Sequence, residues 1–208
     1  MEKLFYEIEL PLCQVLADME HTGFYVDRKA LFEFGESLNE GISSLQQSIW
    51  EHAGAQFNIN SPKQLGEVLF DKLMLPSGKK TKTGYSTDAD VLEKLKIHSP
   101  VVEKVIEYRK LTKLKSTYAD GLSEVINPYD KKIHSKFNQT VTMTGRISST
   151  EPNLQNIPMR SELGREIRKM FVPTDSDRIL VDADYSQIEL RILAHIADDE
   201  IMINAFKN

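Results

Sequence analysis

Two carboxylates near the C-terminal end of the sequence offer its clearest chemistry. Residues 178–200 have the sequence RILVDADYSQIELRILAHIADDE. The apolar residues 179–181 predict a short buried strand that delivers Asp184, and Glu189 follows in the first turns of a helix with an apolar face. A carboxylate at the end of a buried strand is costly unless it binds a cation or a partner, so this placement predicts a metal site.

Three further polar residues lie close to these carboxylates. Alternation along a strand puts Asp182 on the same face as Asp184, so spacing alone leaves both open as metal ligands. We interpret His195 as a residue of the helix face and Asp198 as a helix terminus or cap.

Composition indicates an ordinary globular chain. Its 208 residues can bury one good core or two smaller ones, and 40% of them are hydrophobic. No apolar run approaches the roughly 18 residues of a membrane helix, and the acidic, mixed N-terminus argues against a secretory signal. The single Cys13 excludes an internal disulfide and fits a reducing compartment. We therefore expect a cytoplasmic protein that does not contact membranes.

Basic side chains cluster upstream of the carboxylates, although the net charge of the chain is −5. Such local stripes suit contact with nucleic-acid phosphates, which depends on where Lys and Arg gather and not on the total charge. The clusters contain Lys79, Lys80 and Lys82; Lys110, Lys113 and Lys115; Lys131, Lys132, His134 and Lys136; and Arg160, Arg165, Arg168 and Lys169.

The elements that must position these groups begin with helices. Residues 3–21 predict an amphipathic helix that ends near Gly23. After a short extended segment, Asp27 can cap a long helix over 28–53, and a helix over 101–126 carries a matching apolar stripe. Matching stripes predict that the two long helices form an antiparallel pair.

A smaller helical tip is predicted between the long helices. Ser61 and Gln64 resemble a capping box for a helix over 62–73, and Ser86 or Thr87 can cap a short helix over 88–96. The loop 76–87 is rich in Gly, Lys and hydroxyl residues. It is either a plain surface loop or a segment that contacts a phosphate backbone, and both interpretations stay open here.

After Pro128 the pattern becomes extended. Residues 132–149 predict one or two antiparallel strands with a Thr-Gly turn, and residues 151–158 predict an ordered polar loop. A helix over 162–170 and the strand over 178–184 follow.

Long motifs in this sequence resemble family A DNA polymerases. TGRISSTEPNLQNIP (144–158) is followed by DYSQIELR (184–191), and the likeness extends upstream through 57–70, 79–95 and 108–118. The resemblance implies an α+β fold, with a helical thumb (a long antiparallel helix pair with a small helical tip) on an incomplete antiparallel palm sheet. Residues 1–26 would begin the palm or a connector helix, 27–130 would form the thumb, and 131–208 would form the N-terminal part of the palm.

The resemblance also implies chemistry for the carboxylates: two-metal nucleotidyl transfer with Mg²⁺ and deoxynucleoside triphosphates. Asp184 would bridge the metals and the carbonyl of Tyr185 would add a ligand, whereas Asp182 has no assigned role. Glu189 would exclude a 2′-hydroxyl from the nucleotide pocket. Its neighbours in the pocket would be Ser186, Gln187 and Ile188.

Contacts to primer-template duplex DNA follow from the same resemblance. Arg146 would reach the minor-groove side of the primer terminus. Asn153, Gln155 and Asn156 would contact template and primer, although an Asx turn explains Asn153 equally well. Lys115, Ser116 and Thr117 would contact the primer backbone, and Lys82 would add a contact from the tip.

Three hypotheses follow. The first is a fragment of a bacterial, nucleoid-associated polymerase of replication and repair, inactive alone because the second metal-binding aspartate is expected beyond residue 208. The second is a non-catalytic module that binds duplex DNA. The third is a metal-dependent nuclease or phosphatase that uses Asp182, Asp184 and Glu189. An incomplete sheet would also expose apolar area and invite non-physiological self-association.

Overall fold

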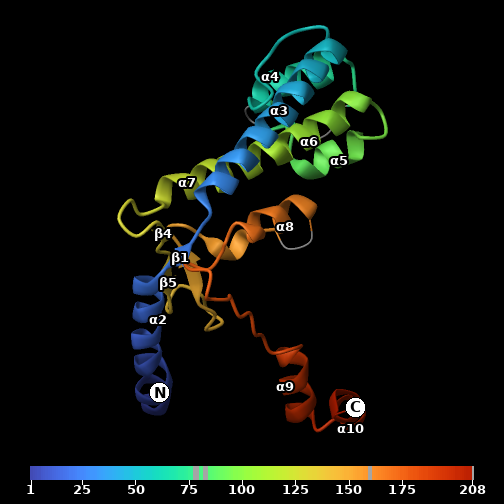
Figure 1. Ribbon diagram of the computed structural model, residues 1–208. Helices are drawn as coiled ribbons and strands as arrows, with labels where there is room; N and C mark the ends of the chain where they lie inside the picture. The colour runs from blue at the N-terminus through green and yellow to red at the C-terminus, as the bar shows by residue number, and fades with distance from the viewer. Residues whose placement is uncertain (77–79, 82–83, 159–160, 208) are drawn as a thin grey trace. The chain divides into compact units, whose positions relative to one another are not determined.

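A computed structural model describes residues 1–76, 80–81, 84–158 and 161–207 (Figure 1). The chain divides into two compact units, Met1–Val172 and Pro173–Asn208. No described helix is both long enough and apolar enough to cross a membrane.

The N-terminal helix of the first unit consists of three consecutive segments. They are α1 (Glu2–Leu4), the π-helical η1 (Phe5–Glu9) and α2 (Leu10–Thr22). As predicted, the helix ends at Gly23, which has a φ of 61°. A side chain at this position would bring its Cβ within 2.8 Å of the His134 ring, so both the backbone angle and the close packing require glycine.

The predicted antiparallel pair of long helices is present. The helix α3 (Arg28–Ala53) begins where the carboxylate of Asp27 accepts hydrogen bonds from the amides of Lys29 (2.9 Å) and Ala30 (3.0 Å). The returning helix consists of α6 (Pro100–Leu114), the π-helical η3 (Lys115–Asp120) and α7 (Gly121–Val125). Figure 1 shows α3 and α6 lying side by side.

Two buried clusters stabilise this pair, one near each end. The first joins the start of α3 to η3, α7 and α8, and contains Val26, Leu31, Phe34, Leu38, Leu114, Tyr118, Ala119, Leu122, Ile133, Ile167 and Met170. The second joins the end of α3 to the tip, and contains Ile49, Ile59, Leu65, Leu69, Phe70, Leu92, Leu95, Val101, Val102, Val105 and Tyr108. The predicted seam of α3 therefore contributes to both clusters.

The tip contains α4 (Pro62–Gly66), the π-helical η2 (Glu67–Lys72) and α5 (Ala89–Leu95). The strands β2 (Lys80–Thr81) and β3 (Gly84–Tyr85) pair between them. The predicted N-cap of the first tip helix is confirmed, because the hydroxyl of Ser61 accepts from the amide of Gln64 (3.4 Å). Two details were wrong: the carboxamide of Gln64 accepts from the amide of Asn58 (2.8 Å) and not from Ser61, and the N-cap of α5 is Asp88.

Short antiparallel strands follow the long helices. Strand β1 (Phe24–Tyr25) pairs with β4 (Lys132–Ile133), and β5 (Lys136–Asn138) pairs with β6 (Ser148–Thr150). The 3₁₀ helix η4 (Leu154–Asn156) lies within the predicted polar loop. The helix α8 (Glu162–Lys169) follows, with Ser161 as its N-cap. Helices and small antiparallel sheets together give the predicted α+β fold class.

The second unit contains α9 (Ile188–Ala197) and α10 (Glu200–Lys207). The predicted strand over 178–184 is wrong, because these residues have no regular secondary structure and pair with none of the described strands. Its apolar side chains are not buried either: Ile179 is 82% exposed and Val181 is 80% exposed. As predicted, Asp198 terminates α9, with a φ of 49°.

Candidate active site and nucleic-acid interface

Asp184 lies in an exposed segment of the second unit that has no regular secondary structure. Its Oδ1 atom accepts a hydrogen bond from the amide of Tyr185 (2.8 Å). The expected burial of the carboxylate at a strand end is therefore wrong. Asp182 and Asp184 lie in a segment without regular secondary structure, so the shared face that strand alternation predicted for them is not established.

A complete metal site is not formed by the residues that the structure describes. Among them, no group of three or more His, Cys, Asp and Glu side chains converges to hold an ion. The carboxylate of Asp184 and the carbonyl of Tyr185 have suitable hard oxygens for Mg²⁺, but they supply only part of a ligand set. The cluster of Asp182, Asp184 and Glu189 that the third hypothesis requires is therefore not formed among the described residues.

The predicted nucleotide-binding residues are consecutive across a turn and the start of α9. Gln187 is the N-cap residue, with a φ of 52°. Glu189 lies in the first helical turn, where the positive end of the helix dipole stabilises a carboxylate. Ser186, Gln187, Ile188 and Glu189 are all exposed.

Arg191 stabilises this turn, a role that the sequence did not suggest. Its Nε donates to the carbonyl of Ser186 (2.8 Å), and its guanidinium lies 4.7 Å from the centroid of the Phe206 ring. One side chain thereby ties the turn before α9 to α10.

The predicted backbone contacts Lys115, Ser116 and Thr117 lie together in η3. The ammonium group of Lys115 is 2.8 Å from the carboxylate of Asp120, so its charge is partly compensated within the chain. The hydroxyl of Ser116 donates to the carbonyl of Lys113 (3.3 Å), and Thr117 is exposed.

In the loop before α8, several of the predicted DNA-binding side chains form hydrogen bonds with the chain itself. Asn153 accepts from the amide of Gln155 (3.0 Å), which is the Asx turn that the sequence left open. The carboxamide of Gln155 donates to the carbonyl of Ile147 (2.9 Å) and accepts from the amide of Ser149 (3.3 Å). The side chain of Asn156 is exposed. The DNA contacts of all three residues stay predictions.

Arg146 follows the predicted Thr-Gly turn and is exposed. Gly145 has a φ of 76°, which suits glycine, and the hydroxyl of Thr142 donates to the carbonyl of Arg146. The turn therefore has a fixed backbone just before β6. Lys82, the remaining predicted contact, lies outside the described residues.

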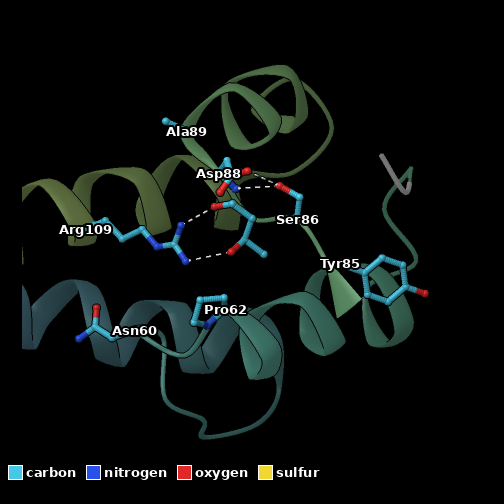
Figure 2. Close-up of a pocket in the computed structure, with 8 residues that line it drawn as sticks. Asn60, Pro62, Tyr85, Ser86, Asp88, Ala89 and Arg109 are labelled. Carbon is cyan, nitrogen blue, oxygen red and sulfur yellow. Dashed lines mark hydrogen bonds between the residues drawn. The ribbon is translucent and has the colours of Figure 1, made fainter. Parts of the chain in front are cut away.

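The tip contains a polar cavity of about 540 Å³ (Figure 2). Arg109 of α6 donates through Nη1 to the carbonyl of Thr87 (2.5 Å) and through Nη2 to its hydroxyl (3.2 Å). Burial lowers the pKa of Arg109, and the charge of Asp88 opposes this effect. The cavity is lined by Asn60, Pro62, Tyr85, Ser86, Thr87, Asp88, Ala89 and Arg109.

The sequence did not single out Arg109. Because its partner Thr87 lies 22 positions earlier in the chain, no local spacing could have identified the contact. The hydroxyl of Ser86 donates to the carboxylate of Asp88 (2.7 Å) just before α5. The lining of the cavity thus combines the half-buried guanidinium of Arg109 with hydroxyl, amide and carboxylate groups.

Similar proteins match this sequence over nearly the whole chain. DNA polymerase I of Geobacillus stearothermophilus is 57% identical over 206 residues, which cover 99% of this chain and 24% of that protein. DNA polymerase I of Bacillus subtilis (strain 168) is 54% identical over 206 residues, covering 99% of this chain and 23% of that protein. The chain thus spans about a quarter of the length of the curated relatives it matches.

A solved structure and a family model agree with these relatives. The POL domain of Pol1 from M. smegmatis, in complex with DNA primer-template and dNTP, superimposes with a TM-score of 0.85 and 45% identity. The match covers 99% of this chain and 36% of that chain. The model for DNA polymerase family A matches residues 28–208. This chain therefore belongs to DNA polymerase family A.

Proposed function

We propose that the chain is part of a DNA-directed DNA polymerase that acts in replication and repair. Its substrates would be primer-template duplex DNA and deoxynucleoside triphosphates. The observation that carries the proposal is the 0.85 TM-score, at 45% identity, to a domain whose complex holds DNA primer-template and dNTP. Since the relatives are bacterial, the enzyme would act in the cytoplasm on nucleoid DNA.

We propose that side chains of the first unit bind the duplex. The exposed side chains of Thr117, Arg146 and Asn156 offer a hydroxyl, a guanidinium and an amide. Contacts of these kinds bind phosphates and minor-groove acceptors without reading sequence. Lys115 would join them, whereas Asn153 and Gln155 would act partly by holding the loop.

We assign part of the metal and nucleotide site to the second unit. Asp184 and the carbonyl of Tyr185 would contribute oxygens to Mg²⁺, and Glu189 would exclude a 2′-hydroxyl with help from Ser186, Gln187 and Ile188. In two-metal polymerases the ions stabilise the charge that develops during phosphoryl transfer. Because the described residues supply an incomplete ligand set, we propose that these 208 residues alone do not extend a primer.

Duplex binding and primer extension test the two parts of the proposal separately. We expect the chain to bind a fluorescent primer-template, with affinity that falls as salt rises, and Asp184→Ala to leave this affinity unchanged. We expect no Mg²⁺-dependent extension. Absence of duplex binding would contradict the proposed interface, and clear extension would contradict the proposed inactivity.

A second candidate function is a non-catalytic module that binds duplex DNA. It is favoured by the position of the predicted DNA contacts in the first unit, together with the absence of a metal cluster from the described residues. A primer-extension assay distinguishes the two candidates when this sequence replaces the matching segment of a complete family A polymerase. Only the first predicts that Asp184→Ala then abolishes extension.

We further propose that the isolated chain self-associates without physiological purpose. Large apolar side chains of the second unit are exposed, among them Ile196 at 76% and Ile201 at 84%. Such surface favours association in water. Sedimentation at increasing protein concentration tests this, and a monomer throughout would contradict it.

A further inference from the structure

Tyr118 connects η3 to the loop before α8 through one hydrogen bond. Its side chain is buried in the first cluster, with 6% of the residue exposed. Its hydroxyl donates to the carbonyl of Asn156. Burial also raises the pKa of the Tyr118 hydroxyl. A phenol in such a core needs a partner for its hydroxyl, and here the partner is the backbone beside a predicted DNA contact.

The other end of this loop is anchored by two buried serines. The hydroxyls of Ser135 and Ser149 lie 2.6 Å apart, and Ser135 Oγ is 2.5 Å from the carbonyl of Pro152. The amide of Leu154 donates to Ser149 Oγ (3.3 Å). One consistent direction runs from the Leu154 amide through Ser149 and Ser135 to the Pro152 carbonyl, so every hydroxyl proton has an acceptor. The loop is therefore fixed near residue 152, and Tyr118 fixes it again at residue 156.

Tyr118 follows Thr117 directly in the chain. The segment with exposed groups at Ser116 and Thr117 is thus tied, through one side chain, to the loop that exposes the amide of Asn156. We propose that Tyr118 is a positioning residue for duplex binding. It holds the Asn156 amide at a fixed place relative to η3, so that both bind the same duplex without ordering the loop first. This inference rests on the proposed function.

The benefit of such a contact is lower ordering cost. A loop that must be immobilised on binding loses conformational entropy at that moment, which weakens affinity. Because the Tyr118 ring already packs in the core, replacing it with Phe removes the hydroxyl and keeps the packing. The affinity change in this variant therefore reports the hydrogen bond and not a cavity.

Tyr118→Phe, Asn156→Ala and their combination test the inference in this chain. The probe is a fluorescent primer-template, and hydrogen exchange is followed at the amides of 153–157. We expect Tyr118→Phe to weaken binding about fivefold, equivalent to about 1 kcal/mol, and to accelerate exchange in the loop. The double variant should bind no more weakly than the weaker single variant, because both changes disable the same contact.

Tyr129→Phe is the matched control, because Tyr129 is 93% exposed. The duplex affinity and the loop exchange of this variant should equal those of the unaltered chain. Unchanged affinity in Tyr118→Phe, or losses that multiply in the double variant, would overturn the inference. A purely structural role would lower the unfolding temperature without this loss of affinity. Failure of the unaltered chain to bind the duplex would instead overturn the proposed duplex interface on which this inference rests. In that case hydrogen exchange at the loop amides still tests whether Tyr118 holds the loop. Unchanged exchange in Tyr118→Phe would show that it does not.

Discussion

The two units of the chain use apolar side chains in opposite ways. In Met1–Val172, Ile49, Leu69 and Val102 are completely buried between helices. In Pro173–Asn208, Ile179 and Ile196 belong to equally apolar stretches, yet both are more than three-quarters exposed. An apolar pattern therefore states that a surface requires burial, but it does not identify the surface that covers it.

The two units resemble each other in how their helices are capped, although they differ in how far apolar side chains are buried. Asp27 caps α3 in the first unit, and Asp199 accepts from the amide of Met202 (2.9 Å) at the start of α10 in the second. Capping depends only on residues within one turn, so it forms wherever the local sequence permits. Burial depends on distant residues and is the property in which the two units diverge.

The largest difference between the units is expected when one isoleucine in each is replaced by alanine. Ile49→Ala leaves a cavity in a packed cluster and should destabilise the chain by about 2–5 kcal/mol. Ile179→Ala removes an exposed side chain and should change stability by less than about 0.5 kcal/mol. Urea unfolding followed by far-UV circular dichroism measures both. Equal losses in the two variants would show that the contrast in burial is false.

Much of the first unit was predictable because its determinants are local or regular. Asp27 marks the start of α3, and the three- and four-residue spacing from Leu31 to Ile49 identifies the buried seam. The strand expected over 178–184 failed for a physical reason. A strand requires a hydrogen-bonded neighbour, and no periodicity within its own residues supplies one.

The candidate site divides in the same way. The Asx turn of Asn153 involves residues two positions apart, so turn chemistry could suggest it. The contact from Tyr118 to Asn156 spans 38 positions, and that from Arg109 to Thr87 spans 22. Such pairs depend on how α6 and its continuation pack, which sequence patterns alone do not specify.

Arg109→Met should give the next largest effect. The change keeps the length of the side chain but removes both donors to Thr87, whose carbonyl and hydroxyl are then left buried without them. Unsatisfied buried polar groups cost about 1–3 kcal/mol each, and we expect a total loss of about 2 kcal/mol, the lower limit for two such groups together. Thermal unfolding measures it.

The matched variant in the second unit is Arg178→Met. Arg178 pairs with Asp175 at 3.2 Å, but its side chain is 69% exposed. Exposed ion pairs contribute about 0–1 kcal/mol, so its unfolding temperature should hardly change. A larger loss for Arg178→Met than for Arg109→Met would reverse the comparison of the two units.

Removal of the two caps should give a smaller and more even pair of effects. Asp27→Ala should cost about 1 kcal/mol, because two amides at the start of α3 lose their acceptor. Asp199→Ala should lower the helicity of α10 locally but leave the main unfolding transition unchanged. Hydrogen exchange resolves the two regions, and loss of the main transition in Asp199→Ala would show that the units unfold together.

The smallest effect concerns the pH dependence of one contact in the first unit. The carboxylate of Asp130 accepts hydrogen bonds from the amide of Lys132 (3.1 Å) and the ring of His134 (2.8 Å), and the pKa of Asp130 falls below its usual 3.8, mainly through the amide of Lys132. Since the folded pKa is lower than the unfolded one, this contact stabilises the fold above 3.8 and is lost as pH falls through the folded pKa. The stability gap between the chain and Asp130→Asn should therefore exist at neutral pH and close in acid. Urea titrations across this range measure the gap, with the exposed Asp90→Asn as the charge control. A gap that widens in acid would mean that the carboxylate is favoured in its protonated form.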